Sequence, residues 1–418
     1  MDSKEKEKYI ALNDGYLKDM SDDKTPDAVT RDLSYCLSRQ AERLKDHNIV
    51  MHEEYLFQDE AITGAIEPDK KENSTPFRGA VAYRETVRTT EFYQGGEKVF
   101  NRREPVTFYS VIVDKDGGSD DVTVNCPNCG AATLASKLQE GCPYCGTFFK
   151  ISELFPRISS CYTVDGIIER VGFEDRLKKF FTRFAIAAFA VILIFLFITD
   201  RNETELPVVF LVLKNLFLSG MLAALLTFVS YMCYSASLVV KVFAQLGNVL
   251  PMLGAGSSQN RLKKKMENLD PNFFIRIFEG KLVSLLQAVL YSNDRDTLSI
   301  YEGNDDLSEF DDMIDMDYRG VFKLRDFGIR NGRVSILLEV FTDNTYAQKR
   351  LKRRKEQILV RMERSANAVT DTGFSIHAVR CGNCGGSFDA LHERNCPYCG
   401  NEYHAADSDW VITEIRKK

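Results

Sequence analysis

The sequence predicts an α+β protein whose two soluble regions flank a hairpin of two membrane-spanning helices. Two long apolar runs without charge lie near the middle of the 418-residue chain. Cysteines on both sides of these runs have the pairwise spacing of metal sites. Strand-like segments also recur in the same order on both sides. The net charge of −6 excludes a protein that binds nucleic acid through an overall positive charge.

Residues 1–170 are predicted to form the first α+β domain. Residues 26–48 favour a helix. Alternating apolar and polar side chains indicate half-buried strands at residues 77–94, 104–117 and 158–164. The start of the chain is charged and lacks the apolar segment of a secretory signal. We therefore expect this region to stay on the side of the membrane where it is synthesised.

Residues 176–245 are predicted to form a transmembrane hairpin with spans at about 180–199 and 213–240. Each run reaches the ~20 residues that a bilayer crossing requires, and the alternative is a pair of buried helices in a soluble protein. Basic residues flank both spans, whereas the connecting loop is acidic, so both termini are expected in the cytoplasm. The flanking residues are Arg176, Lys178, Lys179, Arg183, Lys241, Arg261, Lys263, Lys264 and Lys265.

Eight of the eleven cysteines form four Cys-x-x-Cys pairs and predict two zinc ribbons, at 124–148 and 379–402. A redox function needs only one such pair, and an iron–sulfur centre fits the ligands less well than zinc. Four thiolates leave no open coordination position, so we expect two structural zinc ions. Reduced thiolates also agree with a cytoplasmic location. The ligands are Cys126, Cys129, Cys142, Cys145, Cys381, Cys384, Cys396 and Cys399.

A basic linker at 246–269 is predicted to lead into a second α+β domain at 270–418. Asp270 is expected to cap a helix that begins at Pro271, and residues 294–313 are expected to form a second, acidic helix. Strand patterns follow, and the ribbon again precedes the last strand, which we interpret as an internal duplication. The expected strands are 332–343, 356–367, 374–380 and 408–415.

The second soluble region also carries a family resemblance. The matching residues are Phe278, Lys281, Leu282, Ala288, Asp296, Leu298, Glu356–Arg361 and the closing strand Trp410–Ile415. On these residues it resembles the Tim-forty-four-like domain, the C-terminal domain of the mitochondrial import-motor anchor in the nuclear-transport-factor-two-like cone superfamily. The inserted ribbon and the second copy depart from that family. The resemblance implies cone-like domains that dock on membranes and proteins and do not catalyse a reaction.

One strongly basic segment remains, at residues 349–355. It is interpreted either as a solvated turn between two strands or as a contact with anionic lipid headgroups, where each basic residue contributes ~1 kcal/mol. Nucleic acid ranks third, because no aromatic residues for base stacking accompany the charges. The candidate lipid-binding residues are Lys349, Arg350, Lys352, Arg353, Arg354 and Lys355.

We therefore expect a multi-pass membrane adaptor that binds an unidentified protein partner, and not an enzyme. The chain has only five histidines, and the sequence pairs none of them, His377 included, with a carboxylate. The first alternative is a small-molecule enzyme or sensor that uses a cone cavity. The second is a membrane-tethered zinc-ribbon protein that binds nucleic acid.

Overall fold

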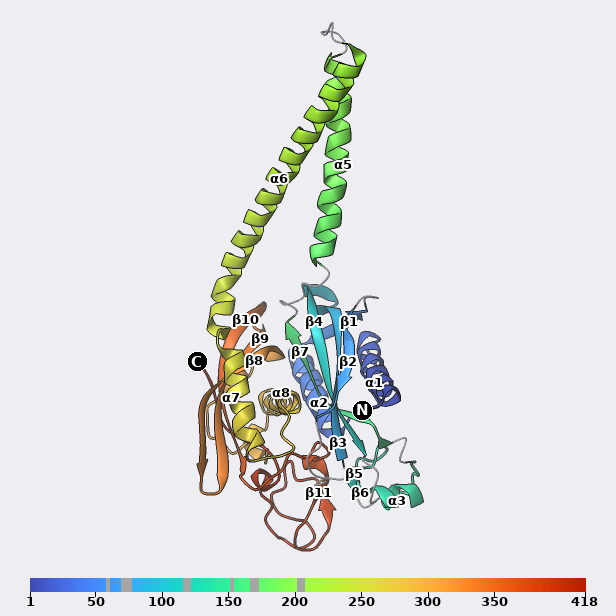
Figure 1. Cartoon of the computed structure of the whole chain (residues 1–418). Coiled ribbons are helices and arrows are strands. Elements are labelled where there is room, and N and C mark those ends of the chain that lie inside the picture. The colour runs from blue at the N-terminus through green and yellow to red at the C-terminus, as the bar shows by residue number, and fades with distance from the viewer. Residues whose placement is uncertain (58–60, 69–76, 116–121, 151–153, 166–172, 201–206) are drawn as a thin grey trace. The chain divides into compact units, whose positions relative to one another are not determined.

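The computed structural model describes residues 1–57, 61–68, 77–115, 122–150, 154–165, 173–200 and 207–418 (Figure 1). Of residues 165, 173–180, 200 and 235–250 it describes the backbone only. The chain divides into two compact units, which we call the α+β unit (Met1–Gly166 with Gly254–Lys418) and the helical hairpin (Ile167–Leu253). The mixed helix and sheet content confirms the α+β prediction. The two soluble regions, expected as separate domains, lie together in one compact unit.

The first soluble region contributes two helices and a five-stranded sheet to the α+β unit. These elements are α1 (Ser3–Ser21), α2 (Arg31–Asp46), β1 (Ile49–Leu56), β2 (Thr63–Ile66), β3 (Phe77–Gln94), β4 (Glu97–Lys115) and β7 (Arg157–Asp165). The antiparallel order is β1-β3-β4-β7, with β2 paired to β3. Gly95 and Gly96 join β3 to β4, and both have positive φ, as a tight turn between twisted strands requires.

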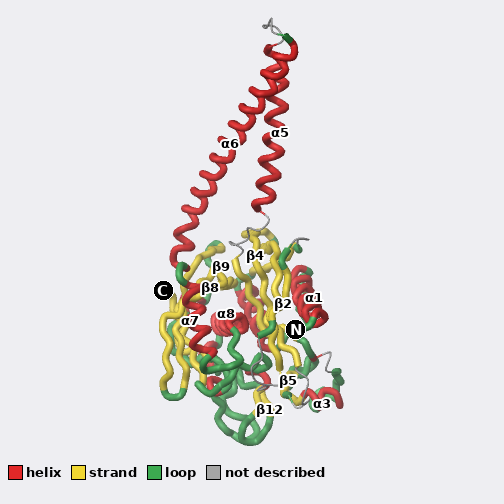
Figure 2. Tube along the Cα trace, in the orientation of Figure 1, coloured by secondary structure: helices red, strands yellow, loops and turns green. Residues whose placement is uncertain are grey.

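The second soluble region contributes α8 (Ile275–Tyr291) and a four-stranded sheet. The strands are β8 (Met313–Arg330), β9 (Arg333–Ala347), β10 (Leu351–Ser365) and β13 (Val411–Lys417). Their order, β8-β9-β10-β13, places a ribbon between the third and last strands, as in the first sheet. The turn between β8 and β9 is Asn331-Gly332, again with positive φ at both residues. Figure 2 shows the helices and the strands of both sheets.

The predicted acidic helix at 294–313 is wrong. Only two single 3₁₀ turns form there, at Arg295–Thr297 and Ser308–Phe310. The chain between them is not helical, because its backbone pairs with other segments: the Ser299 amide donates to the Leu391 carbonyl at 2.7 Å, and the Glu302 amide to the Ile412 carbonyl at 2.8 Å. The expected strand at 374–380 is likewise reduced to a 3₁₀ turn followed by the short β11 (Val379–Arg380).

The expected helix start at Asp270 and Pro271 is also wrong, since α8 begins at Ile275. The Asp270 side chain is buried and has a different function. Its Oδ2 accepts hydrogen bonds from Arg364 Nη2 at 2.6 Å and from the Thr370 hydroxyl at 2.5 Å. A carboxylate that appears locally to be a cap therefore pairs with a buried cation from β10.

Part of the predicted basic linker, 246–269, is a helix, α7 (Ala255–Glu267). Leu262 and Met266 are fully buried on its apolar side. Ser258 Oγ accepts a hydrogen bond from the Leu324 amide at 2.6 Å, and Arg261 Nη2 donates to the Leu324 carbonyl at 2.7 Å. Packing against β8 stabilises this segment as a helix. The segment is therefore part of the α+β unit and not only a linker.

Helices α2 and α8 pack against each other and join the two soluble regions. The Tyr35 hydroxyl lies 2.9 Å from Ser292 Oγ. The buried guanidinium of Arg43 donates to the carbonyls of Leu290 at 3.2 Å and Tyr291 at 3.0 Å. A cation from the first region thus satisfies the carbonyls at the C-terminus of the second region's helix, where the helix dipole favours positive charge.

Charged side chains are also buried between the two sheets. Arg88 of β3 holds Asp317 of β8 through two hydrogen bonds of 2.8 Å, and a third bond of 2.7 Å reaches Glu104. Arg102 lies 3.3 Å from Asp315. Burial and the neighbouring Asp317 raise the pKa of Asp315 to about 7. Breaking such a pair leaves an uncompensated charge, which typically costs about 3–5 kcal/mol.

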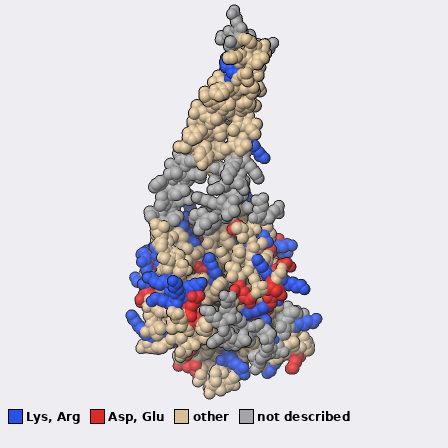
Figure 3. Space-filling view, in the orientation of Figure 1, with Lys and Arg blue, Asp and Glu red and all other residues tan. Residues whose placement is uncertain are grey.

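The helical hairpin consists of α5 (Phe173–Asp200) and α6 (Val208–Val249). Both contain stretches long and apolar enough to cross a membrane, at Phe181–Thr199 and Val208–Tyr234. The second stretch begins at Val208, earlier than expected. The described surface of both helices carries very few charges (Figure 3). The side chains of Arg176, Lys178, Lys179 and Lys241, used above for the orientation, lie outside those that are described.

Candidate metal centres and the adjoining cavity

Each ribbon brings four cysteine thiols together. Within each set all sulfurs lie within 4.8 Å of one another. The Sγ–Sγ distances are 3.7 Å for Cys126–Cys145 and Cys129–Cys142, and again 3.7 Å for the matching pairs of the second ribbon. A disulfide needs ~2.05 Å, whereas four thiolates around one zinc ion at ~2.3 Å are about 3.8 Å apart. The geometry fits a metal centre, and each predicted set of four cysteines comes together in a cluster that could hold one ion.

The four Cys-x-x-Cys turns share one backbone pattern. In every turn the amide of a glycine donates to the carbonyl of the first cysteine at 2.8–2.9 Å. These glycines are Gly130, Gly146, Gly385 and Gly400, with φ between +71° and +75°. Only glycine adopts this conformation without strain. The turn directs both thiols of a pair to the same point, which explains the glycine that follows each pair in the sequence.

An asparagine supports each thiol set from outside. Asn128 Nδ2 lies 3.6 Å from Cys145 Sγ, and Asn383 Nδ2 lies 3.6 Å from Cys399 Sγ. A hydrogen bond with the Thr147 side chain lowers the pKa of Cys145 to about 6, and one with the backbone amide of Asn401 lowers the pKa of Cys399 to about 6. Both thiols therefore lose a proton more readily than an ordinary cysteine, and the thiolate is the form that binds metal. Each asparagine directly precedes the second cysteine of the first Cys-x-x-Cys pair in its ribbon. This repeated position is visible in the sequence.

The two ribbons are anchored differently. The first contains β5 (Thr123–Asn125), β6 (Ala132–Leu134) and α3 (Ala135–Glu140). Its buried Cys126 and Cys142 belong to a small separate core with Leu138 and Phe155. The second contains β11 and β12 (Ser387–Phe388). Its buried Cys381 and Cys396 belong to the main core, together with residues of α8 and β13.

The tips of the ribbons carry exposed aromatic side chains. Tyr144 is 61% exposed, Phe148 68% and Tyr398 60%. Tyr144 and Tyr398 occupy the same position in the two Cys-Pro-Tyr-Cys motifs. The neighbouring Tyr144 side chain raises the pKa of Tyr398. Strand β6 of the first ribbon contacts β12 of the second, so the ribbons touch each other. We call these three residues the ribbon tips.

The basic segment is only partly the turn that one interpretation expected. Lys349 and Arg350 lie in the turn between β9 and β10, while Lys352, Arg353, Arg354 and Lys355 belong to β10. Arg353 pairs with Glu104 at 2.9 Å and with Asp343 at 2.7 Å. The other five cations are exposed.

Histidines do pair with carboxylates, which the sequence did not reveal. The His52 Nδ1 lies 2.6 Å from Asp23 Oδ2. His377 is buried, and its Nδ1 lies 2.8 Å from Asp389 Oδ2. The two residues are twelve positions apart and come together because the second ribbon folds back on the 3₁₀ turn at Ile376–Ala378. His392 and His404 lie outside the thiol set of the second ribbon, as expected.

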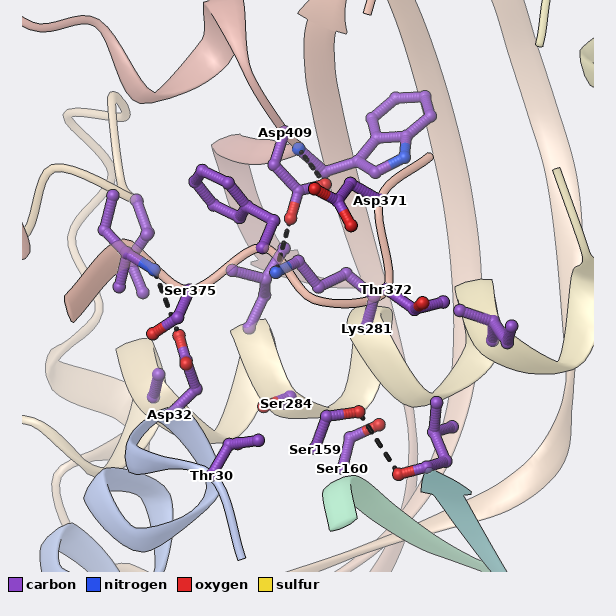
Figure 4. Close-up of a pocket in the computed structure, with 18 of the residues that line it drawn as sticks. Thr30, Asp32, Ser159, Ser160, Lys281, Ser284, Asp371, Thr372, Ser375 and Asp409 are labelled. Carbon is purple, nitrogen blue, oxygen red and sulfur yellow. Dashed lines mark hydrogen bonds and ion pairs between the residues drawn. The ribbon is translucent and has the colours of Figure 1, made fainter. Parts of the chain in front are cut away.

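His377 borders a cavity of about 100 Å³ among α2, α8 and the segment 370–377 (Figure 4). The Lys281 ammonium lies in it, 2.5 Å from Asp409. Burial opposes the charge of Lys281, but Asp409 and Asp32 outweigh it and raise the pKa. Burial raises the pKa of the neighbouring Cys36 thiol to about 12. Neither group is therefore activated as a nucleophile at neutral pH.

Comparison with known proteins adds no identification. No family model matches the chain, and neither a curated protein nor a solved structure matches it.

Proposed function

We propose that the chain is a membrane-anchored adaptor whose α+β unit binds a protein partner and is held together by two structural zinc ions. The observation that carries the proposal is the pair of closed four-cysteine clusters built into that unit. Four thiolates fill the coordination sphere of zinc, so neither site offers a position to a substrate. The donor set and its spacing support zinc over metals that prefer oxygen ligands.

The apolar helices supply the anchor in this proposal. Their long uncharged stretches suit a bilayer, and a run with this much exposed apolar surface is costly in water. Basic residues at Arg183 and at Arg261–Lys265 favour a cytoplasmic location for both termini. A reducing cytoplasm would also keep the eight thiols available for metal.

The ribbon tips are the best candidate for the partner surface. Aromatic side chains are enriched in protein interfaces, where they bury a large area at little entropic cost. Among the described residues of the α+β unit, Phe57 is the only other phenylalanine, tyrosine or tryptophan in the set of large exposed apolar side chains. The tips therefore concentrate exposed aromatic area at one place.

The resemblance to the Tim-forty-four-like family supports a docking function for residues 270–418, with cone-like halves, and remains part of the proposal. Lipid contact is proposed for five basic residues only, because the ion pairs of Arg353 occupy its guanidinium. These residues are Lys349, Arg350, Lys352, Arg354 and Lys355. Internal duplication is supported by the matching strand order of the two sheets.

Site-specific photo-cross-linking in intact cells tests the adaptor proposal. A photoreactive amino acid replaces Tyr398 in one variant and Val99, an exposed residue away from the ribbons, in the other. Detergent purification and mass spectrometry then identify what is attached. We expect one protein in stoichiometric yield from position 398 and none from position 99. Recovery of the uncross-linked chain alone from both variants contradicts the proposal.

A further inference from the structure

The cavity beside α8 has more negative charge than its own cation can neutralise. It is lined by the carboxylates of Asp32, Asp371 and Asp409 and by one ammonium group, that of Lys281. Lys281 is bound to Asp409 at 2.5 Å and lies 5.4 Å above the ring of Phe374. Its one ion pair among the described residues is thus with Asp409, and Asp32 acts on it only through its charge.

The two remaining carboxylates have only backbone donors. Asp371 Oδ1 accepts the Gly373 amide at 2.9 Å, and Asp32 Oδ1 accepts the Ile376 amide at 3.3 Å. Neither forms an ion pair with any cation in the described part of the chain. Figure 4 shows the carboxylates of Asp371 and Asp409 close together above Lys281, with Asp32 on the other side of the cavity. Burial raises the pKa of Asp371 to about 6, which reflects the cost of an uncompensated charge there.

The other walls suit an organic cation. The rings of Phe278 and Trp410 lie against each other at 5.6 Å and line the cavity. Ser159, Ser160 and Ser284 also line it, and the Ser159 hydroxyl donates to the Val111 carbonyl at 3.2 Å. Aromatic faces attract ammonium ions, and hydroxyls accept their N–H donors. Among the described residues, only the cysteine sets bring three metal-ligating groups within 4.8 Å, so this cavity is not a metal site.

We propose that the cavity beside α8 binds a small aliphatic ammonium ion, with the charge against Asp371 and the carbon chain against Phe278 and Trp410. The volume of about 100 Å³ limits the ligand to a few heavy atoms, since a cavity of about 150 Å³ holds one benzene. A free amine and the amino headgroup of a lipid share this chemistry. The proposal is independent of the adaptor function, because no ribbon tip lines the cavity.

Calorimetric titration of the full-length, zinc-loaded protein in detergent tests this inference. The probe is ethanolamine, and its control is 1-propanol, which replaces the ammonium by a methyl group of similar size. We expect binding of ethanolamine at millimolar concentration and none of 1-propanol. Glycerophosphoethanolamine distinguishes the two possible sources of the ammonium ligand. Binding tighter than that of ethanolamine indicates a lipid headgroup, and weaker binding indicates a free amine.

Substitutions then locate the binding. Asp371→Asn should weaken ethanolamine binding tenfold or more, and Asp32→Asn should weaken it less, whereas the exposed Asp407→Asn should leave it unchanged. The thermal unfolding temperature of each variant shows whether it is folded, and either cavity variant suffices if the other unfolds. Equal binding of 1-propanol, absence of ethanolamine binding, or equal affinities for wild type and both cavity variants would overturn the proposal.

Discussion

The two ribbons have nearly the same ligand geometry but different positions in the core. Both hold four thiols with the same 3.7 Å spacings and the same backbone turns. The first ribbon closes a small satellite core at the end of β4, whereas the second is continuous with the core of α8 and β13. Identical local chemistry can therefore stabilise either a local structure or a whole unit, depending on which apolar residues surround the thiols.

The largest effect is expected from removal of the second metal. In Cys381→Ser/Cys384→Ser the second ribbon can no longer hold its part of the main core in place. The whole α+β unit should therefore lose its protease resistance. The zinc content should fall to one ion or fewer. Limited proteolysis and metal analysis of the detergent-purified protein measure both. Cys233→Ser, a cysteine outside the thiol sets, is the matched control. Unchanged protease resistance in the double variant contradicts a structural role for this ribbon.

A smaller effect is expected from removal of the first metal. Cys126→Ser/Cys129→Ser should expose residues 122–150 to hydrogen exchange while α8 and β9 keep their protection, because the satellite core is separate. Zinc content should fall from two ions to one. Hydrogen exchange read by mass spectrometry resolves the two regions. Loss of protection throughout the α+β unit would show that both ribbons support the whole unit. It would contradict the inferred difference between them.

The contact between the two halves can be perturbed without touching either ribbon. Since the pKa of Asp315 in the folded protein is about 7 and its ordinary value is about 4, the fold holds this proton more tightly than the unfolded chain does. The carboxyl group therefore destabilises the fold increasingly as the pH rises from about 4 to 7. Asp315→Asn removes this titration, so the stability of the variant relative to wild type should rise by roughly 2–4 kcal/mol from pH 4 to pH 8. This rise is added to a pH-independent cost of losing the pair with Arg102.

Denaturant unfolding at a series of pH values measures that difference. The exposed Asp312→Asn is the control and should follow wild type at every pH. A constant difference between Asp315→Asn and wild type would mean that the buried carboxyl does not titrate in this range.

The smallest effect is expected from the asparagines that donate to the thiolates. Asn128→Ala and Asn383→Ala should each weaken metal retention by about tenfold, as is usual for outer-shell partners. Competition with a colorimetric chelator measures the retention. Similar losses at both sites are expected, because the two 3.6 Å contacts are alike, although only the second site supports the main core. Unaltered metal retention in both variants would show that the asparagines stabilise only the backbone turn and not the bound metal.

Local features were predictable from the sequence and distant pairings were not. The cysteine spacing and the following glycines define the ribbons because each turn is closed within six residues. Asp270 was misread because its partner Arg364 is 94 positions away. Helix α1 was missed although its buried Tyr9, Tyr16 and Leu17 have helical spacing, because charged residues surround them. The contact of Tyr144 with Tyr398 depends on how the ribbons meet, which no local pattern encodes.

The arrangement of the α+β unit has a consequence for its synthesis. Residues 1–166 leave the ribosome first. The guanidinium of Arg43 can bind the carbonyls of Leu290 and Tyr291 only after these have been synthesised, about 250 residues later. In the proposed membrane-anchored protein, the first half therefore lacks this contact until the apolar helices and α8 have been synthesised. A chain that leaves one unit and returns to it must also cross any membrane an even number of times. A variant with a single crossing would separate Arg43 from its acceptors permanently.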